Sequence, residues 1–78
     1  MVKIQILEKP TDNRLLLSWS EAGRCNYTEQ IWALRKMHRA ATCALTGMLI
    51  SRGERAYMPL GEPANQGNFI STAAVAAV

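Results

Sequence analysis

Three side chains in the sequence are of the kinds that bind zinc or act as nucleophiles: Cys25, His38 and Cys43. A structural zinc site takes four ligands, and two of them are usually paired in a Cys-x-x-Cys knuckle. The position that would complete such a knuckle after Cys43 holds Thr46, which is a poor zinc ligand. We therefore predict no metal and no cofactor, with both thiols reduced. A three-ligand site made of Cys25, His38 and Cys43 is the weaker alternative.

The sequence lacks the residue spacings that are typical of enzymes. A nucleophilic cysteine needs a contacting base and an accessible, electropositive setting, and no spacing in the chain gives His38 that role. There is no Gly-x-Ser-x-Gly motif and no phosphate-binding loop, and the 6 acidic residues are scattered. We therefore predict that the protein is not an enzyme and has no small-molecule substrate.

Basic residues form a second candidate site. The formal net charge is +3, and several cations cluster around Met37. Cations neutralise phosphates, and exposed aromatic side chains such as Trp32 or Tyr57 would stack on bases. The candidate nucleic-acid contacts are Arg35, Lys36, Arg39, Arg52 and Arg55. The alternative is a solvated basic face beside aromatic residues of the core.

The length of 78 residues indicates a single small domain, residues 1–78. A chain of this size buries only about 60% of its unfolded surface, so its core is marginal. This favours a protein partner or a homo-oligomer, and we predict a non-enzymatic interaction or regulatory module. A small basic nucleic-acid-binding protein is the alternative. The candidate protein contacts are Trp32, Phe69, Ile70 and Val75, although Trp32 is equally suited to the core.

The N-terminal residues alternate between apolar and polar types and do not form the apolar segment of a signal peptide. No run approaches the roughly 18 apolar residues of a membrane span. We therefore expect a cytoplasmic protein with no membrane partner.

The elements that must position these residues are mainly strands. Val2, Ile4 and Ile6 alternate with polar residues, and Leu15, Leu17 and Trp19 follow the same period after a turn at residues 10–13; together they predict a β-hairpin. Residues 43–59 predict strand, turn, strand, turn and strand, with glycines in the turns. The expected fold is mainly β, a small rolled or barrel-like antiparallel sheet built from hairpins.

Two segments leave their secondary structure open. Residues 27–41 contain many good helix formers but also the strand-favouring Tyr27, Ile31 and Trp32. The alternative fold is therefore α+β, with one helix near residues 27–41. The small apolar tail at residues 69–78 suits a docked strand, a short helix or a dimer contact.

Three blocks of the chain stand out: Tyr27-Thr28-Glu29-Gln30-Ile31-Trp32, residues 43–59, and Pro63-Ala64-Asn65 followed by Phe69-Ile70. Together these blocks resemble a bacterial family catalogued as domain of unknown function 3331. The resemblance implies a small stand-alone bacterial domain with no assigned activity, and it supplies no catalytic residues. The chain departs from the family at Met58, because the family often carries a basic residue at this position, directly before Pro59.

Overall fold

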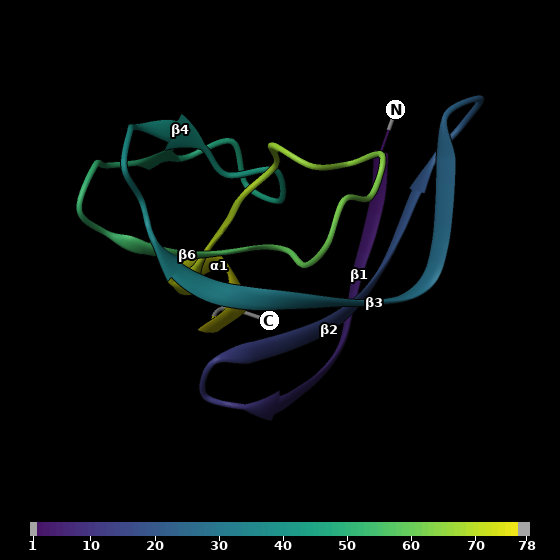
Figure 1. Ribbon diagram of the computed structural model, residues 1–78, viewed down its shortest axis with the longest axis horizontal. Coiled ribbons are helices and arrows are strands. Elements are labelled where there is room, and N and C mark those ends of the chain that lie inside the picture. The colour runs from purple at the N-terminus through teal and green to yellow at the C-terminus, as the bar shows by residue number, and fades with distance from the viewer. Residues whose placement is uncertain (1, 77–78) are drawn as a thin grey trace.

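The computed structural model describes residues 2–76, and most of them lie in strands. A five-stranded antiparallel sheet has the order β1-β2-β3-β6-β7 and is strongly curved (Figure 1). Its strands are β1 (Val2–Thr11), β2 (Arg14–Glu21), β3 (Cys25–Lys36), β6 (Arg55–Pro59) and β7 (Ile70–Ser71). A small second sheet pairs β4 (Ala41–Thr42) with β5 (Leu49–Ile50), and α1 (Thr72–Ala76) follows β7. The predicted mainly β, rolled antiparallel sheet is confirmed.

The predicted N-terminal hairpin is confirmed by the pairing of β1 with β2. Ile4 lies opposite Trp19 and Ile6 lies opposite Leu17. Leu15, Leu17 and Trp19 are buried, whereas the residues between them are only partly buried. The alternation in sequence therefore follows from one face of β2 packing into the core.

The alternative of a helix near residues 27–41 is wrong, because residues 25–36 form β3. This strand pairs with β2 on one edge and with β6 on the other. Trp32 lies opposite Leu15, and its ring centroid is 5.6 Å from that of Trp19. Pairing on both edges and burial of the indole ring therefore outweigh the helix propensity of the surrounding residues.

The block at residues 43–59 contains two of its three predicted strands, β5 and β6. The first predicted strand is not there, because β4 ends at Thr42 and Cys43 forms only an isolated bridge. Gly47 has a φ of 77° in the turn between β4 and β5, which favours glycine. Gly53 has a φ of 92° in the turn that leads to β6. These turns allow the chain to reverse twice and bring β6 back to pair with β3.

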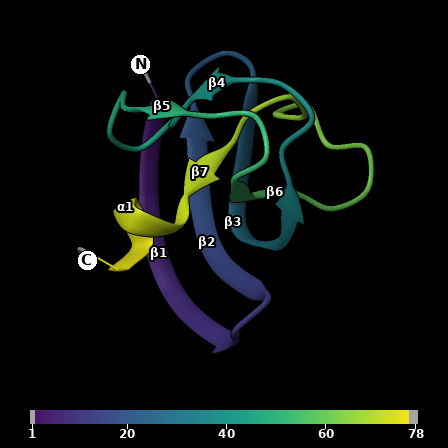
Figure 2. The same cartoon turned by 90° about the vertical axis from the view of Figure 1, so that its left-hand side faces the viewer.

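The C-terminal segment forms both a strand and a short helix. β7 pairs with β6, and the Ser71 hydroxyl then accepts a hydrogen bond from the Ala74 N–H at 3.1 Å, which caps α1. Ile70 and Ala74 join the same core as Leu15 and Leu17, so β7 and α1 face β2 across the core (Figure 2). The last part of the predicted tail, residues 77–78, lies outside the described residues. Within residues 2–76, no helix has the length and apolar character needed to cross a membrane.

Candidate functional site

A groove of about 730 Å³ lies where β3 extends beyond β2. Strand β2 begins at Arg14, opposite Ala33, and the Leu34 N–H donates to the Asn13 carbonyl at 2.9 Å. Beyond this bond, Arg35 and Lys36 are paired only with β6. The end of β3 is therefore an open strand edge, and the groove is formed around it.

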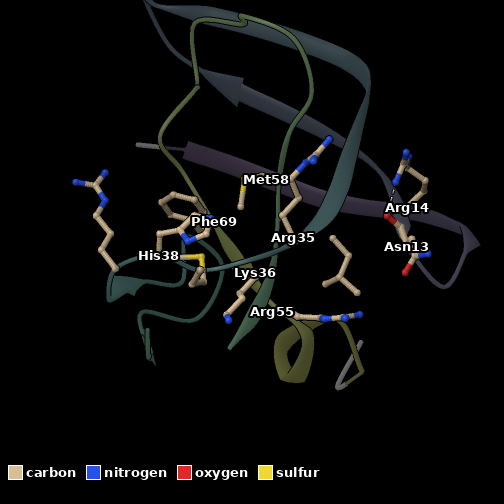
Figure 3. A pocket seen from close by; sticks show the side chains of 11 residues that line it. Asn13, Arg14, Arg35, Lys36, His38, Arg55, Met58 and Phe69 are labelled. Atoms are coloured by element: carbon tan, nitrogen blue, oxygen red, sulfur yellow. Dashed lines mark hydrogen bonds between the residues drawn. The ribbon is translucent and has the colours of Figure 1, made fainter. Parts of the chain in front are cut away.

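The side chains around this groove carry positive charges and no carboxylate. Its lining residues are Asn13, Arg14, Leu34, Arg35, Lys36, Met37, His38, Arg39, Arg55, Met58 and Phe69 (Figure 3). Most of the arginine and lysine side chains are exposed, and Arg14 is partly buried. The volume of the groove falls within the roughly 300–1,000 Å³ of typical ligand sites.

The strand register divides this lining between two faces of the sheet. Ala33 lies opposite Met58 and Arg35 lies opposite Ala56, so Arg35 and Met58 share a face. Lys36 lies directly opposite Arg55 on the other face. Figure 3 shows this division, with Arg35 and Met58 on one side of β3 and Lys36 and Arg55 on the other.

The Lys36–Arg55 pair lowers the stability of the fold locally. Like charges directly opposite each other on neighbouring strands are destabilising. The nearest acid in sequence, Glu54, accepts a hydrogen bond from the Ser51 N–H at 3.1 Å. Among residues 2–76, the ion pair present is Arg24–Glu21, so no groove cation has a carboxylate partner there. Stability of the fold therefore does not explain this arrangement of charges.

The loop that carries His38 and Arg39 is anchored at Met37. The Met37 N–H donates to the Glu54 carbonyl at 2.7 Å, and the Met37 carbonyl accepts from the Gly53 N–H at 2.9 Å. The Met37 side chain is buried in the core. These contacts fix the start of the loop beside the end of β3, which keeps its exposed cations near Arg35 and Lys36.

The structure brings together most of the predicted nucleic-acid contacts. Arg35, Lys36, Arg39 and Arg55 all line the groove, whereas Arg52 lies in the turn between β5 and β6 and does not. Arg14 and Phe69 also line it, although Arg14 was not predicted as a site residue and Phe69 was predicted only as a protein contact. Their positions depend on strand register between distant segments, and local sequence carries no signal for that.

The predicted stacking role of Trp32 and Tyr57 is wrong. Their exposed fractions are 0% and 1%, so neither ring is accessible to a base. The Trp32 Nε1–H donates to the Gln30 side-chain carbonyl at 2.8 Å, and the Tyr57 hydroxyl donates to the Asp12 carbonyl at 3.4 Å. Both aromatic residues serve the core.

A second polar cluster lies toward the N-terminal end of β3, from the start of the strand to Gln30 near its middle, and we call it the amide junction. The Gln30 and Asn65 side-chain amides exchange two hydrogen bonds of 2.9 Å, and both side chains are buried. The Tyr27 hydroxyl accepts from the Ala64 N–H at 2.8 Å. The first and third blocks of the family resemblance thus contact each other and hold the segment between β6 and β7 onto β3.

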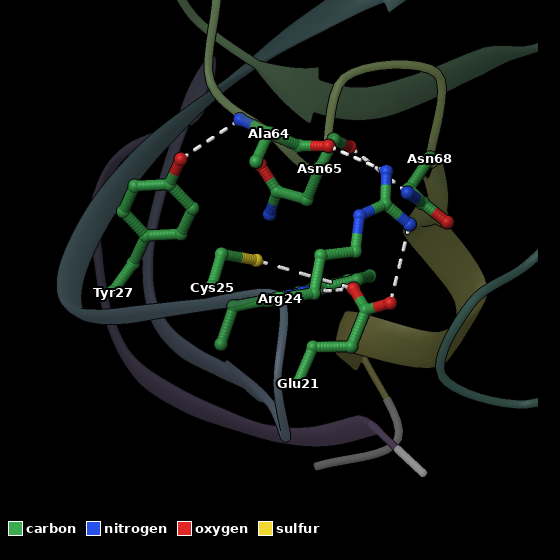
Figure 4. Close-up of polar contacts among 8 residues, drawn as sticks. Glu21, Arg24, Cys25, Tyr27, Ala64, Asn65 and Asn68 are labelled. Carbon is green, nitrogen blue, oxygen red and sulfur yellow. Dashed lines mark hydrogen bonds and ion pairs between the residues drawn. The ribbon is translucent and has the colours of Figure 1, made fainter.

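Arg24 extends this junction to the surface. Its guanidinium donates to the Ala64 carbonyl at 2.7 Å and forms the 3.2 Å ion pair with Glu21 (Figure 4). The Asn68 amide donates to the Asn65 carbonyl at 2.9 Å. The described part of the chain contains no buried side-chain nitrogen or oxygen without a partner. These polar groups are therefore satisfied within the fold.

The predicted protein contacts are divided between core and surface. Trp32 and Ile70 have 0% exposure, so the contact role predicted for them is wrong. Phe69 and Val75 are partly buried against the core. The most exposed large apolar side chains among residues 2–76 are Met48 at 68% and Leu49 at 69%, at the β4–β5 turn.

The weak metal candidates are not brought together. Within residues 2–76, no three His, Cys, Asp or Glu side chains form a group that could hold a metal ion. The Cys25 Sγ lies 4.0 Å from the Glu21 Oε1, and Cys43 is buried in the core. The three-ligand alternative of Cys25, His38 and Cys43 therefore finds no support in this geometry.

Cys43 has an unusual environment for a buried thiol. Burial acts to raise the pKa of Cys43, but hydrogen bonds from the Thr46 side chain and from the backbone N–H groups of Ser71, Thr46 and Leu45 outweigh it and lower the pKa from 9.0 to about 7. The Ser71 N–H lies 3.3 Å from the sulfur. The thiol therefore joins the turn after β4 to the start of the C-terminal helix.

Comparison with known proteins places the chain in a family without an assigned activity. Neither the curated proteins nor the solved structures contain a match to it. A family model described as "Domain of unknown function (DUF3331)" matches residues 1–78, the whole chain. The chain therefore belongs to this family of domains of unknown function.

Proposed function

We propose that the protein is a non-enzymatic binding module that holds a nucleic acid in the groove at the open end of β3. The observation that carries this proposal is the charge of the lining, which includes five arginine or lysine side chains and no carboxylate. A phosphate backbone would neutralise these charges and release its own counterions, which favours binding.

The arrangement of the cations favours a ligand with several negative charges. They come from β2, β3, β6 and the loop after β3, and they lie on both faces of the strand end. One isolated anion would satisfy only the cations of one face, whereas a chain of phosphates offers a charge at each step. The opposed Lys36 and Arg55 side chains would exchange mutual repulsion for attraction to the ligand.

The first experiment is fluorescence anisotropy with a labelled oligonucleotide of about 16 nucleotides, the upper end of small single-strand site sizes. The test variant reverses two groove charges, Arg35→Glu with Arg39→Glu. The matched control, Lys3→Glu with Lys9→Glu, makes the same change of net charge on the exposed β1. We expect the test variant to lose at least tenfold in affinity and the control to change less than threefold.

Salt dependence provides the second arm of this experiment. Binding through phosphates should weaken steeply between about 50 and 200 mM salt. Equal losses in the two variants, or binding that is insensitive to salt, would contradict the proposal. Equally tight binding of polyglutamate would assign the groove to acidic proteins instead.

A second candidate function, contact with another protein, is favoured by the β4–β5 turn. Met48 and Leu49 are adjacent in sequence and are 68% and 69% exposed. Exposed apolar side chains that lie next to each other are typical of protein contacts. If this turn joins two copies of the chain, sedimentation velocity of the wild type will show a dimer, and the Met48→Ser, Leu49→Ser variant will be monomeric. A wild-type protein that remains monomeric at high concentration would contradict the proposal that this turn joins two copies of the chain.

A further inference from the structure

The groove also carries an apolar surface that phosphate contacts leave unused. We infer that its ligand is single-stranded nucleic acid and that one base stacks on Phe69; this inference rests on the proposed function. The surface consists of Phe69 and Met58, both partly buried, on the same side of the sheet as Arg35. Cations beside an aromatic ring with part of its face accessible are the combination that binds single strands, since phosphates contact the cations while bases stack on the ring.

Strand register places the ring beside the charge. Tyr57 lies opposite Ile70 and Ala56 lies opposite Ser71. Continuing this register by one residue places Phe69 opposite Met58, which itself lies opposite Ala33 on β3. Because Arg35 is two residues from Ala33, its side chain lies on the same face. A base on Phe69 would therefore have its own phosphate within reach of a cation.

The backbone that carries Phe69 is held in place. Its carbonyl accepts a hydrogen bond from the Ala44 N–H at 2.8 Å, and Phe69 forms a parallel β-bridge with Cys43. The next residue, Ile70, is completely buried. A ring on an anchored backbone loses little conformational freedom when a base stacks on it, which favours affinity.

The other aromatic side chains of the described chain are committed elsewhere. Trp19, Trp32 and Tyr57 are buried. Tyr27 is partly buried at the amide junction, where its hydroxyl accepts from the Ala64 N–H. Among the groove lining, Phe69 is the Phe, Tyr or Trp residue, and His38 adds an exposed imidazole ring beside it; we assign the stacking to the larger apolar ring of Phe69.

The positions of the cations argue against a duplex. Arg35 projects from one face of β3, and Lys36 and Arg55 project from the other (Figure 3). A duplex is stiff, with a persistence length of about 50 nm, and it would present its phosphates to one face only. A single strand is flexible enough to pass around the open end of β3 and contact both faces. It also presents unpaired bases to the ring.

The test compares three labelled ligands. Oligothymidine and the same strand with abasic sites have equal length and phosphate number, and the third ligand is a duplex of that length, which carries twice as many phosphates. Anisotropy at one fixed salt concentration gives the ratio of the oligothymidine and abasic affinities. We expect a ratio of about five to a hundred for the wild type, the range of one stacked base. The duplex should bind more weakly than oligothymidine.

Variants at Phe69 test whether its ring is the one on which a base stacks. Phe69→Leu should bring the ratio close to one without changing the affinity for the abasic strand, and Phe69→Tyr should keep the ratio. A partly unfolded variant would lose affinity for both strands by the same factor and leave their ratio unchanged. The ratio therefore distinguishes loss of stacking from loss of folding. A wild-type ratio near one, tighter duplex binding, or an unchanged ratio in Phe69→Leu overturns this inference while leaving the proposed function intact. Absence of binding to all three ligands overturns the proposed function itself.

Discussion

The two ends of strand β3 use polar side chains in opposite ways. At the amide junction, Gln30 and Asn65 bond each other and Gln30 also accepts from Trp32, so burial leaves no polar group unsatisfied. At the open end, Arg35 and Lys36 are exposed and have no carboxylate partner within residues 2–76. Polar groups that are satisfied internally hold the fold together. Charges without partners, including one directly opposed pair, are available to a ligand.

This contrast separates the two family blocks that meet at the junction from most of the groove, although Arg55, Met58 and Phe69 of the groove also lie in family blocks. The Tyr27 to Trp32 block and the Pro63-Ala64-Asn65 block meet at the junction, where their contacts explain them as structural. The groove draws on residues outside those two blocks, such as Arg14, Arg35 and Arg39. Substitutions at the two ends of β3 should therefore change different measured properties.

The largest expected effect is on stability and lies at the junction. Asn65→Ala removes both amide–amide bonds and leaves the buried Gln30 Nε2 group without a partner, while the Gln30 Oε1 keeps its bond from Trp32; the loss should cost about 2–4 kcal/mol. Thermal denaturation should show a fall in Tm of roughly 10 °C or more. The control, Asn68→Ala, removes one partly buried bond to the Asn65 carbonyl and should cost about 1 kcal/mol or less. Equal costs for the two variants would show that the junction is not a special source of stability.

The next effect concerns the thiol beneath the segment that carries Phe69. The folded pKa of Cys43, about 7, is below its ordinary 9.0, so the unfolded chain binds more protons between these values and stability rises with pH across that window. The contribution is complete above pH 9 and is lost as pH falls through 7. A shift of this size corresponds to about 1–3 kcal/mol.

Urea denaturation of the wild type and of Cys43→Ala, both kept reduced, measures this contribution. The difference in unfolding free energy between the two proteins should grow by about 1–3 kcal/mol from pH 6.5 to 9. Subtracting the unfolding free energy of the variant from that of the wild type at each pH cancels the contribution from titration of all other groups. A difference that stays constant over this range would contradict the hydrogen-bonded thiolate.

A smaller effect has opposite signs for stability and for binding. Lys36→Glu replaces a repulsive cross-strand pair with an attractive one opposite Arg55, so it should stabilise the fold by about 0.2–1 kcal/mol. The same change should weaken oligonucleotide binding, because it removes one cation from the groove and adds an anion. The control is Lys3→Glu, which lies opposite Ser20 and should leave both properties nearly unchanged. A destabilised Lys36→Glu protein would contradict the cost assigned to the opposed pair.

The smallest expected effect is a gain. Met58→Lys adds a cation between Arg35 and Phe69 and should raise oligonucleotide affinity a few-fold, with a log–log salt slope steeper by about 0.7. Met48→Lys makes the same chemical change at the exposed β4–β5 turn and should leave the slope unchanged. If both variants steepen the slope equally, the ligand responds to net charge and not to the groove.

The sequence predicted what depends on local pattern and left open what depends on distant pairing. Alternation at Ile4, Ile6 and Leu15–Leu17 was enough to predict the first hairpin, and the cations at Arg35 and Lys36 could be grouped because they are neighbours in sequence. Residues 25–36 have mixed propensities, so only pairing with β2 and β6 decides that they form a strand. The placement of Phe69 beside Met58, and of Asn65 against Gln30, depends on contacts between distant segments.

The most direct test of the central claim is a titration of the ¹⁵N-labelled protein with oligothymidine, followed by two-dimensional NMR. Both ends of β3 are observed in the same experiment. The account predicts shifts of the amide signals of Arg35, Lys36, Arg55 and Phe69, and unchanged signals at Tyr27 and Ala64. Shifts confined to the amide junction, to β1 or to the β4–β5 turn, or no shifts at all, would contradict the assignment of the ligand to the open end of β3.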